Sequence, residues 1–399
     1  MEIVKKEVLL YVIGAARVGS LGAGRRNRSA RYLSNARPCG AAFHRFMNLL
    51  FTLLLVLASL TATAQQAELA ALLKKENVAG MQLVYRHGRT TKTYSLGLRR
   101  AGTAEVVTAT TIFQAASLGK VVLAYTALRL HDRGLLDLDK PLLAYYPYPR
   151  LLHEPRADRI TARMVLGHTT GLPNWAENPT DPTWPTSALH LRYAPDSCWS
   201  YSGEGYVFLQ KMLEHLTGQS FEALAEAEVF RPLGMKNSGF AWRPGFAATA
   251  ATGHDGKGQP TDIKQFAAPY GAYSLLTTAT DYNHFLQAVM TGRGLKPATA
   301  RLLTTPANPA DRCGHPASPA DPAIAWACGL GLATTSQGMA QWHWGDNGDF
   351  KGFFMTLPGK DESVVFLTNS SNGARLADEV LRLFFGPGQY WATQWLAEE

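Results

Sequence analysis

A serine and a lysine three residues apart have the clearest capacity for chemistry in this chain. The stretch from Ser117 to Lys120 reads Ser-Leu-Gly-Lys and leads into the apolar run from Val121 to Leu130, which predicts a buried helix. One helical turn separates the two side chains, so they share a face. A hydroxyl at a helix N-terminus lies where a nascent oxyanion is stabilised, and a buried lysine more readily becomes a neutral proton acceptor. The pair predicts an activated serine nucleophile, although a surface lysine near a helix-capping serine would show the same four residues.

Two other short stretches place chemically capable side chains near predicted element ends. Tyr201 opens a Tyr-Ser-Gly stretch at the head of a predicted helix over residues 202–217, and His343 opens a His-Trp-Gly stretch on a predicted strand from Gln341 to Trp344. Taken alone, such a tyrosine is more often a packed aromatic residue, and such a histidine is a common resident of a strand.

With these three stretches in this order, the chain resembles the serine β-lactamase and penicillin-binding protein superfamily. It is most similar to the branch that holds class C β-lactamases, D-Ala-D-Ala carboxypeptidases and related esterases. The resemblance covers about residues 70–385 and includes further stretches that begin at Arg133, Leu166 and Arg231. It implies an α/β (α+β) fold of the β-lactamase/transpeptidase type, in which an antiparallel sheet is flanked by helices and an all-helical subdomain is inserted.

The resemblance also implies a role for each motif residue. Ser117 is expected to be the nucleophile that forms an acyl-enzyme, and Lys120 is expected to accept its proton. Tyr201 is expected to carry a proton between these two residues and the leaving group.

The strand motif is expected to supply the electrostatics of the site. His343 would stand at its cationic position, beside Gly345, and would polarise the site or meet a substrate carboxylate. The backbone N–H groups of Ser117 and of Asp346, which follows the motif, would form the oxyanion hole.

Two departures from the family pattern bear on the substrate. The second motif commonly ends in Asn, which would hold the lysine and bind a substrate amide, and here the residue is Gly203. The third motif of β-lactamases usually has Lys and Thr or Ser, where this chain has His343 and the bulky Trp344. Lys351 is a candidate for a substitute cation. These departures favour an esterase or peptidase over a strong β-lactamase.

Other conspicuous residues have structural interpretations. His168 is expected to shape a turn. The tryptophans Trp175, Trp184 and Trp326 could line a cleft, but loop tryptophans more often cover a core, and no role follows from sequence for Glu204.

Hydrophobic patterning predicts a sheet interrupted by helices. A hairpin is expected over residues 80–96, the end of a strand at residues 110–113, a strand at 364–368 and a closing helix at 374–385. Helices are expected at residues 67–76, 117–133, 161–168, 202–217 and 220–230, and regular structure is expected to resume over 273–276 and 281–290. Sheet segments at about 65–130 and 270–399 would therefore enclose a helical subdomain at about 131–269.

The basic charge of the chain is concentrated near its N-terminus. Residues 1–64 hold nine of the 39 Lys and Arg residues but only two of the 31 acidic residues, so residues 65–399 are nearly neutral and nucleic-acid binding is not expected. The uncharged apolar stretch 46–60 followed by Ala62-Thr63-Ala64 predicts a signal peptide, cleaved after Ala64, and export to the periplasm or outside the cell. Met47 is a plausible start, which would make residues 1–46 an over-extended reading frame. An uncleaved membrane anchor and an organellar transit segment are the alternatives.

The cysteines leave their pairing open. Cys313 and Cys328 flank a Pro- and Asp-rich loop and could form a disulfide, with Cys198 left over, and the alternative is three unpaired thiols. No spacing suggests a metal site, and the expected chemistry needs no cofactor. Residues 65–399 also contain no zinc-binding His-Glu-x-x-His, no phosphate loop and no Gly-x-Ser-x-Gly elbow.

The sequence therefore predicts an exported, monomeric serine hydrolase that forms an acyl-enzyme on Ser117. Its substrate is expected to be an ester, an amide or a peptide with a D-amino acid, with weak β-lactamase or D-Ala-D-Ala carboxypeptidase activity as a further possibility. The alternative is a non-catalytic binding protein that keeps the fold and the cleft.

Overall fold

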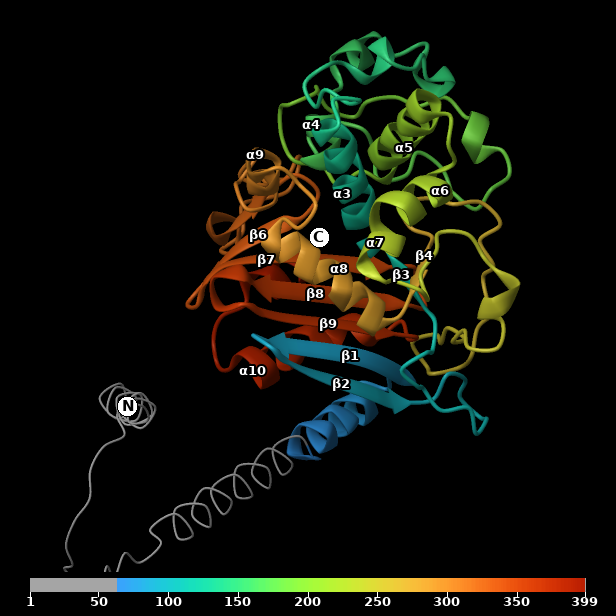
Figure 1. The fold of residues 1–399 in the computed structure, drawn as a ribbon, viewed down its shortest axis with the longest axis vertical. Helices are drawn as coiled ribbons and strands as arrows, with labels where there is room; N and C mark the ends of the chain where they lie inside the picture. The colour runs from blue at the N-terminus through green and yellow to red at the C-terminus, as the bar shows by residue number, and fades with distance from the viewer. Residues whose placement is uncertain (1–62, 399) are drawn as a thin grey trace, which may run out of the picture. The chain divides into compact units, whose positions relative to one another are not determined.

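The computed structural model describes residues 63–398, and its largest element is a seven-stranded antiparallel sheet (Figure 1). Strands from the beginning and the end of this part of the chain are neighbours in the sheet, because the first strand, β1, pairs with the last, β9. In spatial order the strands are β2 (Thr90–Gly97), β1 (Gly80–His87), β9 (Glu362–Thr368), β8 (Lys351–Leu357), β7 (Gly338–Asp346), β6 (Gly331–Thr335) and β5 (Ile324–Trp326).

Successive residues of the central strands enter two different cores. In β9, Val365 and Leu367 belong to one buried cluster, whereas Val364 and Phe366 belong to the other. Side chains alternate across a strand, so a strand buried on both faces is apolar at nearly every position. This explains why the β9 sequence is a short continuous apolar run.

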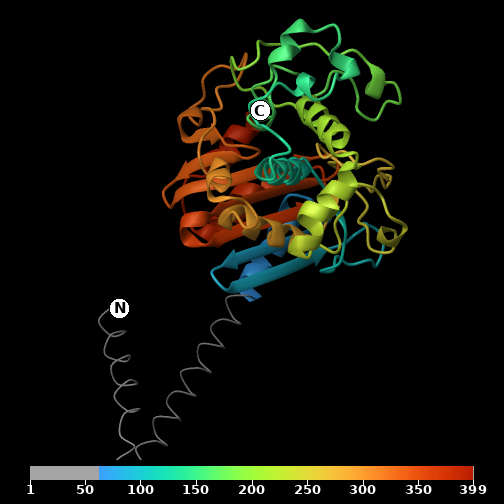
Figure 2. The same cartoon turned by 45° about the horizontal axis from the view of Figure 1, so that its top comes forward.

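Helices cover both faces of the sheet (Figures 1 and 2). The helices α3 (Leu118–Asp132) and α8 (Ala279–Thr291) supply one core, and α9 (Pro297–Ala300) follows α8. The other core receives a helix that includes residues 63–75, together with α10 (Ala377–Phe385) and α11 (Trp391–Ala397).

A helical region lies beyond the sheet and includes most of the chain between α3 and α8 (Figure 1). A small second sheet of β3 (Phe113–Ala116) and β4 (Leu275–Thr277) lies where this region begins and ends. The region contains α4 (Ala162–Leu166), α5 (Gly203–Thr217), α6 (Phe221–Ala225), a π turn (Glu226–Phe230) and α7 (Arg231–Leu233). Short 3-10 turns across the described residues are Leu142–Ala144, Pro149–Leu151, Pro155–Arg159, Trp184–Thr186, Pro244–Phe246, Arg301–Leu303, Asp321–Ala323, Pro358–Lys360 and Gly373–Leu376.

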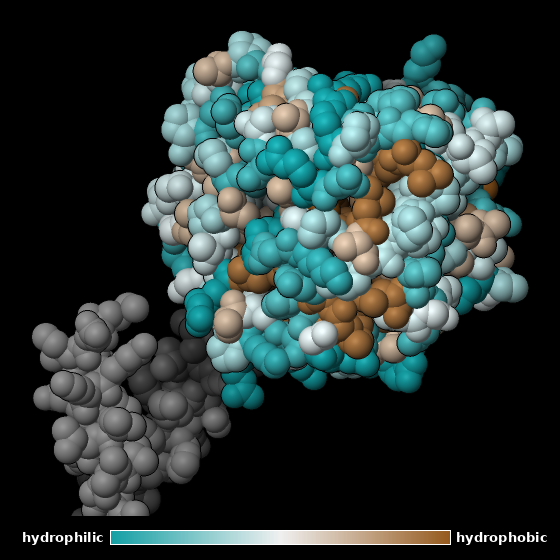
Figure 3. Space-filling view, turned by 90° about the horizontal axis from the view of Figure 1, so that it is seen from above, coloured by the Kyte–Doolittle hydropathy of each residue, from teal (hydrophilic) through white to brown (hydrophobic). Residues whose placement is uncertain are grey.

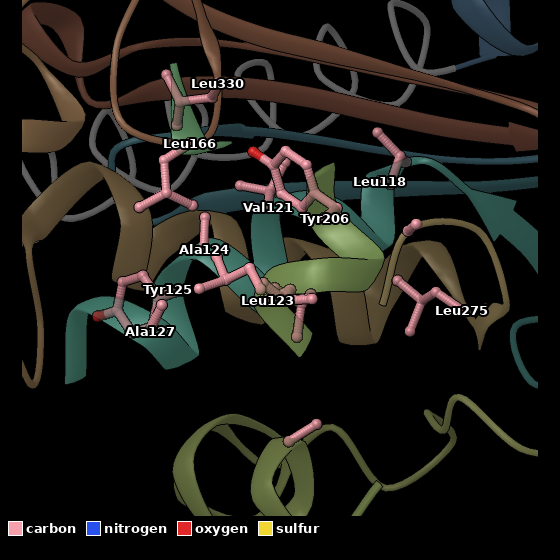
Figure 4. Close-up of a cluster of buried hydrophobic side chains, with 14 of the residues drawn as sticks. Leu118, Val121, Leu123, Ala124, Tyr125, Ala127, Leu166, Tyr206, Leu275 and Leu330 are labelled. Atoms are coloured by element: carbon pink, nitrogen blue, oxygen red, sulfur yellow. The ribbon is translucent and has the colours of Figure 1, made fainter. Parts of the chain in front are cut away.

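The helix α3 is enclosed on all sides. Its residues Val121 and Ala124 lie in one buried cluster with Leu166, Tyr206 and residues of the sheet (Figure 4). A helix that is apolar all round is stable only inside a protein, which the apolar run after Lys120 predicted. This enclosure sets the environment of the first turn of α3.

Most predicted elements are confirmed with small shifts. The hairpin is confirmed: His87 pairs with Thr90, and only Gly88 and Arg89 form the turn, with Gly88 at a φ of 57°. The expected strand end at residues 110–113 is wrong in position, since β3 occupies Phe113–Ala116. The strands β5, β6 and β8 and the helix α11 were not predicted, since short apolar segments carry little periodicity of their own.

The cysteine pairing differs from the one considered from sequence. Cys198 is bonded to Cys313, with their Cα atoms 5.3 Å apart, and Cys328 is a free, buried thiol. A backbone bridge between Trp199 and Arg312 brings the first two cysteines together. A Cys313–Cys328 disulfide is therefore wrong, because the long-range pairing of two loops decides the partner.

The N-terminal predictions lie almost wholly outside the described residues. The apolar stretch 46–60 and the cleavage motif up to residue 62 belong to that part, whereas Gln65 is described and accepts hydrogen bonds from Lys92 and Tyr94. None of the helices over residues 63–398 combines the length and the apolar character needed to cross a membrane. On the face that Figure 3 shows, hydrophobic residues gather in small patches within a mainly hydrophilic surface.

Candidate active site

Ser117 lies at a sharp turn between β3 and α3. It is the N-cap residue of α3, and Ala116 before it has a φ of 50°, a left-handed conformation that is strained for a residue with a Cβ atom. Gly345 of β7 packs against this turn, because a Cβ atom there would lie 2.2 Å from the Ala115 carbonyl oxygen. The strand motif and the nucleophile are thus in direct contact, and only glycine fits at residue 345.

Lys120 is fully buried directly beneath Ser117. Its Nζ atom lies 3.0 Å from Ser117 Oγ and donates a hydrogen bond of 2.7 Å to the carbonyl oxygen of Ala272. Burial disfavours the charged amine and lowers the pKa of Lys120 to about 7. Near neutral pH a substantial fraction of this amine is therefore unprotonated and in reach of the serine proton.

Three aromatic rings surround the Lys120 amine. Nζ lies 4.8 Å from the ring centroid of Tyr201, 5.7 Å from that of Tyr206 and 5.9 Å from that of Trp175. Cation–π attraction would favour the charged form, but it is worth only about 0.5 to 2 kcal/mol. Loss of hydration is the larger effect here, so the rings act mainly by excluding water from the amine.

Tyr201 is held in place through His168. His168 has a φ of 57°, its Nδ1 atom accepts a hydrogen bond of 3.1 Å from the Ser202 backbone N–H, and its ring lies 4.4 Å from that of Tyr201. Burial is the main reason that the pKa of His168 lies well below its usual range, so the ring is neutral and can accept this bond. The turn-shaping role expected of His168 is confirmed.

His343 does not supply a cation. It is fully buried, and its Nδ1 atom is 2.7 Å from the Trp344 carbonyl oxygen, a geometry in which Nδ1–H donates. Burial, together with the nearby charge of Lys120, lowers the pKa of His343 to about 3. The expectation of a positive charge at this position is wrong, because the His343 side chain is fully buried beside Tyr201 and does not line the cavity, whereas Trp344 does.

A cavity of about 540 Å³ opens above the nucleophile. Ser117, Tyr201, Trp344 and Asp346 line it, together with Trp175, Tyr273, Phe266, Arg192, Lys264 and other residues of surrounding loops. His343 and Lys351 are not among the lining residues. Lys351 instead forms a close ion pair with the Asp346 carboxylate, which neutralises the charge of the lysine.

The edge of β7 supplies a backbone donor to the cavity. Its partner β6 pairs only with residues 338–342, so the segment from Trp344 to Asp346 continues beyond it. The Asn347 N–H bonds the Phe350 carbonyl oxygen, on the side of β8. Backbone groups alternate between the two edges of a strand, which directs the Asp346 N–H to the edge facing the cavity. This arrangement is suited to an oxyanion hole with the N–H of Ser117.

Two residues at the site were passed over in the sequence. Trp175 was left aside as a cover of the core, yet its indole contacts the space next to Gly203, and Glu204 is a fully buried carboxylate paired with Arg150. An acidic residue directly after the Tyr-Ser-Gly motif and before the apolar run Tyr206 to Leu209 was the available signal for Glu204. A cleft lining was one interpretation of Trp175, but its contact with Gly203 had no sequence signal because it arises from the fold of a long loop.

Within residues 63–398, no group of three or more His, Cys, Asp or Glu side chains is arranged to hold a metal ion. The arrangement of Ser117, Lys120 and Tyr201 is that of a nucleophile with a buried base and a neighbouring proton carrier. Such a site can form and hydrolyse an acyl-enzyme with groups of the chain itself.

Known proteins with similar sequences and folds show the family of this chain. The family model described as Beta-lactamase matches residues 66–384. The chain is 31% identical over 232 residues to Esterase EstB of Burkholderia gladioli, which covers 52% of this chain and 58% of that protein. It is 26% identical over 204 residues to the putative penicillin-binding protein PbpX of Bacillus subtilis, covering 49% and 51%, so the matches span little more than half the length of these curated relatives.

A solved structure of a class C β-lactamase shares the fold. Its TM-score is 0.68 at 20% identity, and the match covers 81% of this chain and 96% of that one. The family match extends over most of the chain and includes every motif residue of the site. The chain therefore belongs to the β-lactamase family of serine hydrolases.

Proposed function

We propose that this protein is a serine hydrolase that cleaves carboxylic esters through an acyl-enzyme on Ser117. The observation that carries the proposal is the fully buried Lys120 amine, 3.0 Å from Ser117 Oγ, with its pKa lowered to about 7. A base with a pKa near the working pH transfers protons most efficiently.

The first half of the reaction transfers the acyl group to the enzyme. Lys120 takes the hydroxyl proton as Ser117 Oγ bonds to the ester carbonyl carbon, whose oxygen becomes an oxyanion facing the N–H groups of Ser117 and Asp346. When the intermediate collapses, the bond to the alkoxide breaks and that oxygen receives the proton through Tyr201. In the second half, a water loses a proton to the same groups, attacks the acyl carbon, and releases the carboxylic acid and Ser117.

The shape of the site favours esters over amides and β-lactams. Gly203 offers no amide side chain to a substrate, and His343 is a neutral, buried residue and not a cation for a carboxylate. Weak β-lactamase or D-Ala-D-Ala carboxypeptidase activity remains a secondary property of such a site. The esterase among the similar proteins supports the same preference.

We also propose that the protein acts outside the cytoplasm as a monomer on a small-molecule or peptide substrate. The Cys198–Cys313 disulfide supports export, since disulfides persist mainly in oxidising compartments. The apolar stretch at residues 46–60 is consistent with the same location.

A serine-directed fluorophosphonate tests the proposal. Intact mass should show one adduct on the wild-type protein and none on Ser117→Ala, and Ser117→Ala should lose p-nitrophenyl ester hydrolysis. Ser200→Ala is the matched control, because Ser200 lines the same cavity and has no assigned role.

The alternative is a non-catalytic binding protein, to which Gly203 and Trp344 first pointed. Absence of any adduct on the wild-type protein would favour that alternative. Parallel incubation with a penicillin should give little or slow Ser117-dependent adduct, whereas rapid formation and decay of that adduct would identify a strong β-lactamase instead.

A further inference from the structure

Trp175 fills the space into which a side chain at residue 203 would project. Gly203 is the first residue of α5, two positions after Tyr201. A Cβ atom on this glycine would lie 2.5 Å from both Cζ2 and Cη2 of Trp175, which is too close for any real contact. An asparagine at residue 203 and the observed position of Trp175 therefore exclude each other, and Gly203 and Trp175 form a matched pair.

Trp175 is part of an aromatic wall of the catalytic cavity. Its ring meets that of Tyr273 edge to face at 5.5 Å, and Tyr273 meets Phe266 in the same way at 5.7 Å. All three residues line the cavity that also contains Ser117. A substrate group on this side of the nucleophile would meet apolar ring surface where an asparagine would have offered an amide.

The loop that carries Trp175 is attached to the start of α5. The Gly203 N–H donates a hydrogen bond of 3.0 Å to Asn174 Oδ1, and the Glu204 N–H donates one of 3.0 Å to the Asn174 carbonyl oxygen. Both N–H groups lie in the first turn of α5, where a helix lacks internal acceptors. Asn174 thus fixes the residue before Trp175 to the motif that contains Tyr201.

Glu204 holds the rest of the loop. Its carboxylate receives two hydrogen bonds from Arg150, at 2.6 and 3.1 Å, one of 3.1 Å from the Ala176 N–H and one of 2.8 Å from Trp184 Nε1. Trp184 in turn meets Trp175 edge to face at 5.8 Å. The Glu204 carboxylate is therefore neutralised by Arg150 and hydrogen-bonded inside the protein. These contacts hold the aromatic wall in place before substrate binds.

We infer that Trp175 is a specificity-determining residue that binds the acyl group of the ester and selects extended apolar acyl chains. This inference rests on the proposed function. The leaving group departs with the proton that Tyr201 supplies, whereas the acyl group stays bonded to Ser117 in the cavity that Trp175 also lines. A flat indole face suits alkyl and aryl groups and gives an acyl group with an amide no hydrogen-bond partner.

Esters with one leaving group and different acyl groups test the inference. We expect wild-type kcat/KM to be at least tenfold higher for p-nitrophenyl hexanoate than for p-nitrophenyl acetate. Trp175→Ala should reduce this ratio about tenfold, and Trp175→Phe should keep most of it. Trp391→Ala is the matched control, because Trp391 is also half-buried but lies in α11 and does not line the cavity.

The pairing with Gly203 gives a second, independent readout. Gly203→Asn alone should lose most activity towards every ester, because its side chain collides with Trp175. The double variant Trp175→Ala/Gly203→Asn should regain activity and favour the p-nitrophenyl ester of N-acetylglycine, whose acyl group carries an amide. Full activity of the single variant Gly203→Asn, with unchanged circular dichroism, would overturn the pairing.

The outcomes distinguish failure of the role of Trp175 from failure of the proposed esterase function. Hydrolysis that depends on Ser117 but keeps its acyl preference in Trp175→Ala overturns the role of Trp175 and leaves the proposed function standing. Absence of any Ser117-dependent ester hydrolysis in the wild-type protein contradicts the proposed function and this inference with it.

Discussion

The turn that carries Ser117 and the loop that carries Trp175 form two sides of one cavity, and they are held in place by different means. Ser117 and Lys120 lie on a helix that is enclosed by apolar side chains. Trp175 lies on a loop with several exposed residues, in which Asn174 accepts a hydrogen bond from the Gly203 N–H and the Ala176 N–H donates one to Glu204. Burial lowers the pKa of Lys120 on one side of the cavity, whereas hydrogen bonds fix the position of the Trp175 loop on the other side.

The largest expected effect is the loss of the Lys120 amine. Lys120→Met keeps the length of the side chain but removes the proton acceptor, so kcat/KM for a p-nitrophenyl ester should fall by about 10²- to 10⁴-fold. The melting temperature should stay the same or rise, because a buried amine is costly to desolvate.

Lys211→Met in α5 is the control for this variant, since Lys211 is partly exposed, is paired with Glu214 and does not line the cavity. If Lys120→Met were as active as the wild type, Lys120 would not be the proton acceptor. The Ser117 side of the cavity would then not differ chemically from the Trp175 side.

The next effect concerns the network of the Trp175 loop. Glu204→Gln leaves the Arg150 guanidinium buried without a counter-charge, so the free energy of unfolding in urea should fall by about 3 to 5 kcal/mol. Glu226→Gln breaks the exposed ion pair with Arg231 and should change the free energy of unfolding by less than about 1 kcal/mol. Equal effects of the two substitutions would show that the buried pair does not hold the loop.

The disulfide should contribute about 2 to 4 kcal/mol, since it closes a large loop between residues 115 apart in sequence. Cys198→Ser/Cys313→Ser should lower the free energy of unfolding by this amount and reduce activity, because Cys198 is three residues before Tyr201. Treatment with dithiothreitol should affect the wild-type protein in the same way and leave the double variant unchanged. A loss of stability of the double variant in dithiothreitol would contradict the prediction, because the reductant would then act on something other than this disulfide.

The two sides of the cavity also differ in how far the sequence predicted them. Ser117 and Lys120 are three residues apart on one apolar helix, so local pattern placed them correctly. The contact of Trp175 with Gly203 and the bond of Cys198 to Cys313 depend on how loops meet after folding, which periodicity does not encode. The neutral state of His343 was missed for the same reason, because its burial comes from neighbouring strands and rings.

The pH dependence of fluorophosphonate labelling tests the central claim, that Lys120 is a buried base for Ser117, most directly. The amine accepts a proton only when it is neutral, so the labelling rate of the wild-type protein should rise with pH through a single ionisation near pH 7. This corresponds to about a tenfold rise from pH 6 to pH 8. The neighbouring His168 and His343 have pKa values below this window and should not contribute. A rate that is constant from pH 5.5 to 8.5, or one that rises only above pH 9, would contradict the account.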